Sequence, residues 1–122
     1  MFSTILTIRK REDISREDFI DYYENKHVPL VGRLLPSTIL SYRRNYVLDD
    51  DPLSVQLAEG RGDDASVPDI AVITEARFAS RAEAEELIRA FLSDEILNQV
   101  LADEDNFIAP GGVRWRVVDV RE

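Results

Sequence analysis

Residues Phe19–Leu30 run Phe-Ile-Asp-Tyr-Tyr-Glu-Asn-Lys-His-Val-Pro-Leu, and this stretch predicts an amphipathic helix. Its apolar and aromatic positions recur at steps of three and four residues, which is the helical period. The predicted stripe consists of Phe19, Tyr23, His27, Leu30 and Leu34. His27 is the only histidine of the chain, and histidine is the side chain whose ordinary pKa lies nearest neutrality. A titratable ring on an apolar helix face is therefore a candidate for chemistry.

The predicted helix is longer than this stretch and runs from about Arg16 to Leu34. Ser15 is the expected N-cap, and acidic side chains follow it in the first turn, where the helix dipole favours negative charge. Pro29 lies inside the predicted helix and has no backbone N–H to donate. A kink or a break is therefore expected just after His27.

Four further segments are rich in β-branched and aromatic residues and predict strands. They are Phe2–Arg9, Thr38–Leu48, Asp69–Phe78 and Val113–Val120. A second helix is expected after Ser80, with a further helical piece from Ser93. Residues 49–68 predict a long acidic loop, of the kind that serves as a lid or an unstructured insertion. Pro110-Gly111-Gly112 predicts a turn before the last strand.

The order β-α-β-β-α-β predicts a single α+β domain over residues 1–122 with the ferredoxin-like plan. In that plan two helices cover one face of an antiparallel sheet. Each predicted strand carries apolar residues at both parities, which is typical of a sheet buried on both faces. We therefore expect the helix-free face to pack against a second copy of the chain, giving a homodimer with a barrel-like core.

Composition excludes several classes of partner and of site. The 122 residues carry a formal net charge of −9, which repels a nucleic-acid backbone and an anionic membrane surface. The chain has no cysteine, so disulfides and thiolate chemistry are excluded. No charged leader precedes an apolar segment, and no apolar run approaches the ~20 residues of a membrane helix. A cytoplasmic location is expected.

The segment from Ser15 to Leu30, with Tyr22-Tyr23 followed by His27-Val28-Pro29-Leu30, resembles the EthD family of the dimeric α+β barrel superfamily. The tyrosine-bearing strand around Tyr42, the segment from Asp69 into the helix after Ser80, and Asp105-Asn106-Phe107 extend the similarity over nearly the whole chain. The acidic loop and Thr74-Glu75 in the third strand depart from the family pattern. They leave open the shape of any ligand cleft.

The resemblance implies a homodimeric, cofactor-independent enzyme that acts on a small aromatic or polyketide-like molecule. Cyclase, oxygenase, isomerase and dehydratase chemistry are all represented among such relatives. The alternative is a non-catalytic protein that binds or delivers a small hydrophobic ligand. The sequence leaves open whether the chain is an enzyme, because a fold does not determine a function.

His27 is the candidate general acid or base, and its alternative is a buried structural histidine bonded to the backbone. Aromatic side chains form the candidate substrate wall: Phe19, Tyr23, Tyr42 and Trp115. Core packing is the alternative for each of them, and for Trp115 the barrel core or the dimer interface is favoured. Arg43 and Asn45 are expected to face solvent at a sheet edge or to pair across strands. Either could polarise a carbonyl if it pointed inward.

No metal site or cofactor is predicted, since one histidine and no cysteine leave only carboxylates as metal ligands. Nucleotide-binding glycine motifs are also absent from the sequence. Haem ligation by His27 is left open, because one histidine is enough for an axial ligand.

Overall fold

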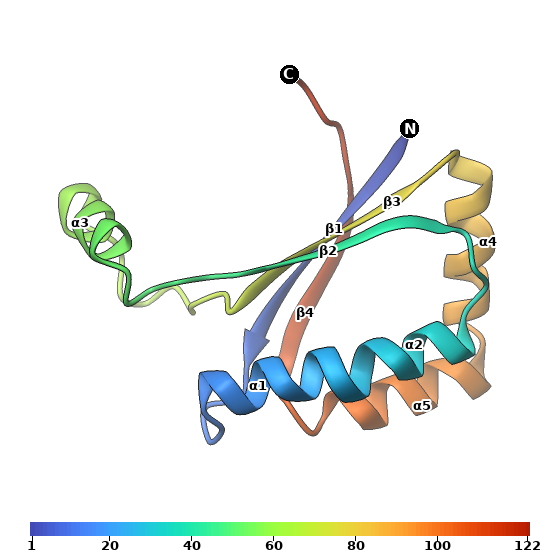
Figure 1. The fold of residues 1–122 in the computed structure, drawn as a ribbon, viewed down its shortest axis with the longest axis horizontal. Coiled ribbons are helices and arrows are strands. Elements are labelled where there is room, and N and C mark those ends of the chain that lie inside the picture. The colour runs from blue at the N-terminus through green and yellow to red at the C-terminus, as the bar shows by residue number, and fades with distance from the viewer.

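The computed structural model describes all residues, Met1–Glu122, and contains one four-stranded antiparallel sheet. Its strands are β1 (Phe2–Lys10), β2 (Ile39–Tyr46), β3 (Val72–Phe78) and β4 (Ile108–Val118), in the order β2-β3-β1-β4. The helices next to the sheet lie on one face of it (Figure 1). The predicted ferredoxin-like α+β fold is confirmed.

The first helix runs through three consecutive segments: α1 (Arg16–Tyr22), η1 (Tyr23–His27) and α2 (Val28–Leu34). Ser15 caps it by accepting a hydrogen bond from the Asp18 backbone N–H. Of the kink or break expected just after His27, the break is wrong, because a π turn ends at His27 and keeps the helix continuous, with the Val28 N–H bonded to the carbonyl of Tyr23. Pro29 consequently lies in the first turn of α2, where proline is tolerated.

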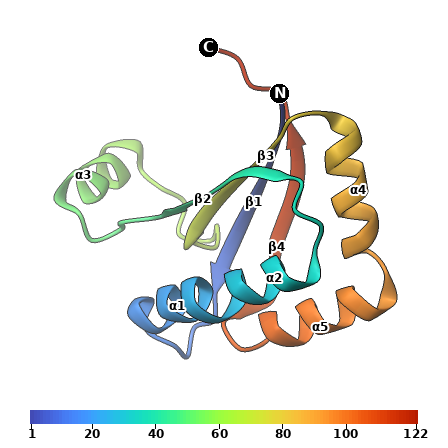
Figure 2. The same cartoon turned by 45° about the vertical axis from the view of Figure 1, so that its right-hand side comes forward.

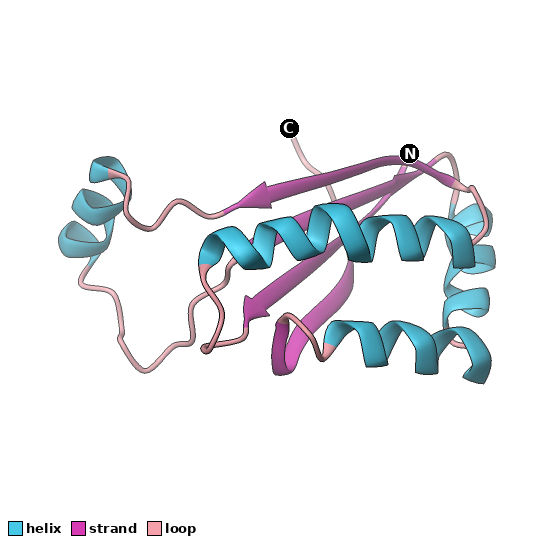
Figure 3. Cartoon of the chain, turned by 60° about the horizontal axis from the view of Figure 1, so that its bottom comes forward, coloured by secondary structure: helices cyan, strands magenta, loops and turns pink.

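Two further helices complete the covered face: α4 (Arg81–Phe91) and α5 (Asp94–Glu104). Ser80 caps α4, and the chain then turns so that α5 runs beside α2 (Figures 2 and 3). One buried cluster joins the first helix to the sheet and contains Phe19, Tyr23, Val72 and Phe107. A second lies under α4, around Phe78 and Leu87. The C-terminal end of α5 is thereby held against the π turn.

The start of β4 differs from the prediction. Pro110-Gly111-Gly112 does not precede the strand but lies within it, as a bulge between the pairs Ile8–Val113 and Lys10–Ile108. Gly111 has a φ of +64°, and a Cβ on Gly112 would lie 2.6 Å from the carbonyl oxygen of Ala109. Glycine is therefore required at both positions to add the extra residues without ending the strand.

Residues 49–68, called the arm below, contain α3 (Pro52–Arg61) and extend beyond the end of β2 (Figure 1). The predicted acidic loop therefore contains a helix, and of its two alternatives the unstructured insertion is wrong. Asp51 caps the helix by accepting from the Leu53 N–H, Pro52 occupies the first turn, and Gly62 closes the helix at a φ of +65°. These are the usual start and stop signals of a helix.

The strand registers define two faces of the sheet. Cross-strand partners share a face, so Tyr42, Thr74 and Trp115 lie on the side of the helices. The helix-free face carries residues of the other parity: Ser3, Ile5, Thr7, Ser41, Arg43, Asn45, Ile73, Glu75, Arg77, Arg114, Arg116 and Val118. This face is more polar than predicted from the apolar residues at both parities of the strands. None of the helices is long and apolar enough to span a membrane.

Candidate functional site

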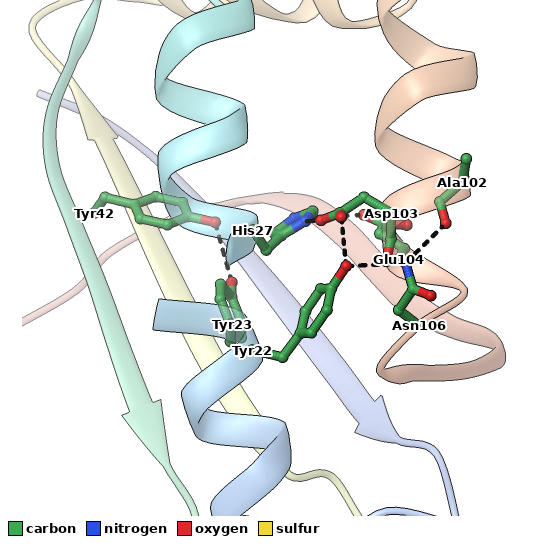
Figure 4. Close-up of polar contacts among 8 residues, drawn as sticks. All are labelled: Tyr22, Tyr23, His27, Tyr42, Ala102, Asp103, Glu104 and Asn106. Atoms are coloured by element: carbon green, nitrogen blue, oxygen red, sulfur yellow. Dashed lines mark hydrogen bonds and ion pairs between the residues drawn. The ribbon is translucent and has the colours of Figure 1, made fainter. Parts of the chain in front are cut away.

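His27 lies at the last position of the π turn and points toward the C-terminal end of α5 (Figure 4). Its Nδ1 is 2.8 Å from Oδ2 of Asp103, and the Tyr22 hydroxyl donates to the other carboxylate oxygen over 2.7 Å. Asn106 in turn donates to the Tyr22 hydroxyl oxygen over 2.9 Å. A carboxylate on Nδ1 fixes the neutral ring as the Nδ1–H tautomer, which leaves the lone pair on Nε2.

The carboxyl group of Glu104 lies on the other side of the ring. Its Oε2 is 4.0 Å from His27 Nε2, beyond hydrogen-bonding distance. Both side chains are largely enclosed, with 6% of the His27 side chain and 17% of the Glu104 side chain exposed. His27 Nε2 thus has no hydrogen bond within the chain and faces a second proton-carrying group.

The pKa values of two of these groups, Glu104 and His27, are shifted from their ordinary values. Burial raises the pKa of Glu104 to about 7, and the neighbouring charges of Asp103 and Asp105 add to this effect. Burial also lowers the pKa of His27, and the hydrogen bond and charge of Asp103 oppose this shift only in part. At neutral pH the ring is therefore mainly neutral, while Glu104 is close to half protonated.

Aromatic hydroxyls line the sheet side of this region. The Tyr23 hydroxyl is 3.1 Å from that of Tyr42 (Figure 4). It also lies 2.9 Å from the Thr74 hydroxyl. Burial raises the pKa of Tyr23, and raises that of Tyr42 well above the usual value. Both phenols consequently stay protonated at neutral pH and can donate or accept hydrogen bonds. The rings of Tyr23 and Phe107 also enclose His27, with centroids 5.6 and 5.0 Å from the imidazole.

A second polar network fixes the edge strand to the π turn. Arg44 on β2 contacts both carboxylate oxygens of Glu24, at 2.6 and 2.8 Å, and the Tyr46 hydroxyl donates to the same carboxylate. Hydrogen bonding to Arg44 lowers the pKa of Glu24. The guanidinium group also stands 5.4 Å from the centre of the Tyr42 ring. This network positions Tyr42 and leaves a positive charge near its phenol.

The EthD domain model matches residues 11–111, which include the whole of this site. The chain belongs to the EthD family. An EthD-like protein from Ralstonia eutropha superposes with a TM-score of 0.60 at 20% identity, covering 99% of this chain and 95% of the other. An ethyl tert-butyl ether d (EthD) family protein from Bacillus halodurans has a TM-score of 0.58 at 11% identity, over 99% and 100% of the two chains.

A third solved structure with the same plan is a dimeric protein of unknown function and ferredoxin-like fold from Bacteroides fragilis. Its TM-score is 0.51 at 8% identity, covering 99% of this EthD chain and 95% of the other. No protein of curated function matches the chain. At these identities the solved relatives show the fold and carry no residue roles.

The structure brings some of the predicted site residues together and separates others. Tyr23 and Tyr42 lie within the network of Figure 4, while Phe19 is buried behind them and packs edge-on against Tyr23. Arg43 and Asn45 are exposed on the helix-free face, and Asn45 donates to the carbonyl of Ile73. Neither side chain points inward, so neither is placed to polarise a carbonyl in the site. The sheet register turns Arg44 toward the helices instead.

Trp115 lies on the helix side of β4, and its ring meets Phe91 edge-on at 5.3 Å. Its indole Nε1 is buried and has no hydrogen-bond partner in the chain. Buried N–H groups are nearly always paired, so an unpaired one calls for an explanation. A ligand with an acceptor atom between the helices and the sheet would supply the missing partner.

Two open surface hollows of this EthD domain lie away from His27. The larger, with a volume of about 1350 Å³, is an open space between the arm and the end of the first helix, lined in part by Arg16, Phe19 and Tyr46. The smaller surrounds Arg11 and Pro110. No group of three or more histidine, cysteine or acidic side chains has a geometry suited to a metal ion. The candidate site is therefore defined by its titrating groups.

Proposed function

We propose that this EthD domain transfers protons on a small aromatic or polyketide-like molecule without a cofactor, with His27 and Glu104 as the acid–base pair. The observation that carries this proposal is the free Nε2 of His27 facing a carboxyl group whose pKa is about 7. Acid–base catalysis is most effective when the pKa of the catalytic group lies near the working pH. Buried pairs with shifted pKa values are also typical of functional sites.

In the proposed step, the neutral imidazole takes a proton at Nε2 from an acidic C–H or a phenol of the substrate. Asp103, hydrogen-bonded to Nδ1, stabilises the imidazolium that forms. Protonated Glu104 returns a proton to another atom of the same substrate, which completes an isomerisation, a cyclisation or a dehydration. The proton balance closes when His27 passes its proton to Glu104.

The proposed substrate is flat and carries a carbonyl or a phenol. The aromatic rings of Tyr23 and Phe107 lie beside the imidazole and favour a planar partner, while the protonated Tyr42 hydroxyl can donate to an oxygen atom. The unpaired indole N–H of Trp115 offers a second donor from the same face of the sheet. We further propose that the functional unit is a homodimer, with the helix-free face of the sheet at the interface.

Hydrogen–deuterium exchange tests the chemistry without knowledge of the natural substrate. Small phenols and aromatic 1,3-dicarbonyl compounds would be incubated with the protein in D₂O, and exchange at the acidic carbon followed by NMR. We expect the wild-type protein to accelerate exchange for at least one class, and His27→Gln to lose about 10²–10⁴-fold of that acceleration. Lys26→Gln, an exposed neighbour in the same turn, is the control.

The same experiment separates the proposal from its alternatives. Equal acceleration by the wild-type protein and His27→Gln would refute a catalytic role for the imidazole. Ligand-induced shifts without any exchange would favour a binding or delivery protein. A fall of several degrees in the melting temperature of His27→Gln, with no change in ligand shifts, would assign His27 a structural role in holding Asp103.

A further inference from the structure

The arm buries little of its surface against the rest of its own chain. None of the α3 residues is buried, and the exposed fractions of Leu53, Leu57 and Val67 are 68%, 67% and 63%. Leu53 and Leu57 are four residues apart and share one side of α3. A helix of ten residues is marginal on its own in water, because helices in proteins depend on packing for most of their stability. The arm therefore lacks a packing partner within one protomer.

The arm is strongly acidic. Residues 49–68 carry six carboxylates and one arginine, for a net charge of −5. Asp51 and Asp64 are used in local hydrogen bonds, but Asp50, Glu59 and Asp63 form no ion pair within the chain. The hollow between the arm and the first helix also shows that the arm does not fold back onto its own body.

The helix-free face of the sheet has the opposite charge. It carries four arginines and one glutamate, although the whole chain has a net charge of −9. None of the arginines takes part in an ion pair: Arg43, Arg77, Arg114 and Arg116. Ile5, Ile73 and Val118 lie among them on the same face. We call this surface the arginine face.

The arm and the arginine face also lie on compatible sides of the molecule. In Figure 1, α3 lies beyond the end of β2 and is displaced from the line of that strand away from α1, α2 and α5, which is the side where a partner's sheet would sit. The arm is attached at the end of β2, and β4 forms the other edge of the sheet. A second copy seated on the helix-free face would therefore meet the arm.

We propose that the arm of each protomer packs along the β4 edge of the arginine face of a second copy of this chain, with its carboxylates on Arg114 and Arg116 and its leucines against that edge of the partner's sheet. The inference rests on the homodimer proposed above and not on the chemistry at His27. Complementary charge determines which surfaces associate, and a twofold axis makes each such contact twice. The carboxylates of the arm and the arginines of the face then pair between protomers, although both sets lack ion-pair partners within one protomer.

Charge exchange between two variants tests this arrangement by sedimentation equilibrium and native mass spectrometry. The face variant is Arg114→Glu/Arg116→Glu, and the arm variant is Asp50→Lys/Glu59→Lys/Asp63→Lys. We expect a wild-type dimer, and a dissociation constant raised about 100-fold or more in either variant alone, because attraction becomes repulsion at both copies of the contact. An equimolar mixture should restore a dimer that contains one chain of each kind.

A matched control removes effects of net charge alone. Arg33→Glu/Arg89→Glu changes the charge as much as the face variant does, at exposed helix positions without ion pairs, and should dimerise like the wild type. Equal melting temperatures would confirm that all variants fold. A wild-type monomer would refute the homodimer itself. A wild-type dimer that the arm variant leaves unchanged, or a mixture that stays monomeric, would overturn only the contact proposed for the arm.

Discussion

Glu104→Gln should remove a pH-dependent loss of stability from this EthD domain. The pKa of Glu104 rises from its ordinary 4.5 to about 7 on folding, chiefly through burial. A raised pKa means that folding favours the protonated form, so its stabilising effect is complete below about pH 4.5 and is lost as the pH rises through 7. At 1.36 kcal/mol for each unit, the loss above pH 8 is about 3 kcal/mol.

The neutral amide that Glu104→Gln introduces would keep most of the shape of the side chain and carry no charge at any pH. We therefore expect wild type and Glu104→Gln to differ little in unfolding free energy near pH 4.5, and the variant to be more stable by up to about 3 kcal/mol at pH 8. His27 acts in the opposite direction: its pKa is lowered by burial, so its contribution is complete above pH 6.5 and is lost as the pH falls. Comparing the two proteins at each pH cancels the His27 part to first order.

Urea denaturation at intervals of half a pH unit measures the difference, with the exposed Glu86→Gln on α4 as a control for loss of one carboxylate. A constant difference in unfolding free energy between wild type and Glu104→Gln from pH 5 to pH 8 would refute the raised pKa of Glu104. Because Glu104 lies 4.0 Å from His27 Nε2, ionisation of either group favours ionisation of the other and lowers the pKa of Glu104, so 3 kcal/mol is an upper bound.

Three other substitutions test the surroundings of the site. Tyr23→Phe removes the hydroxyl shared by Thr74 and Tyr42 and should cost about 1–3 kcal/mol in urea unfolding; an unchanged midpoint would show that water replaces it. Phe107→Ala opens a cavity beside His27 and should cost about 3–5 kcal/mol, seen as a lower melting temperature, and a cost below 1 kcal/mol would contradict the assigned core. Arg44→Met leaves Glu24 half-buried without its cation and should cost about 1–3 kcal/mol at pH 7 but less at pH 4; a pH-independent cost would contradict the pairing.

The sequence predicted the fold well because the elements carry strong local signals. Ser15 and Ser80 cap helices, and the strands have the expected composition and nearly the expected bounds. The exception is β4, which begins at Ile108 and not at Val113.

The helix in the arm was not predicted because, of its large apolar residues, only Leu53 and Leu57 have helical spacing, while Val55 lies on another side, so no extended apolar stripe forms. Its terminal signals were nevertheless present, in Asp51-Pro52 at the start and Gly62 at the end. Short exposed helices depend on such caps more than on an amphipathic pattern.

The candidate site was predicted only in part, because its second half comes from another element. His27 could be singled out from its helix, but its pairing with Asp103 joins residues 76 positions apart. Asp103-Glu104-Asp105 is typical of a solvated helix end, and only the packing of α5 against the π turn buries part of it. Arg43 and Arg44 are likewise indistinguishable until the register with β3 turns one of them inward.

The arrangement of Asp103, His27 and Glu104 implies that the site holds one transferable proton near neutral pH. Asp103 occupies Nδ1 of His27 and keeps the proton there, so exchange with a substrate can occur only at Nε2. Glu104 has a pKa of about 7 and the pKa of His27 lies below its ordinary value, so the free site keeps its extra proton on the carboxyl group rather than on the ring. In the proposed function, the imidazole would therefore begin each turnover as the base and Glu104 as the acid, which is the division of roles needed to move a proton between two atoms of one molecule.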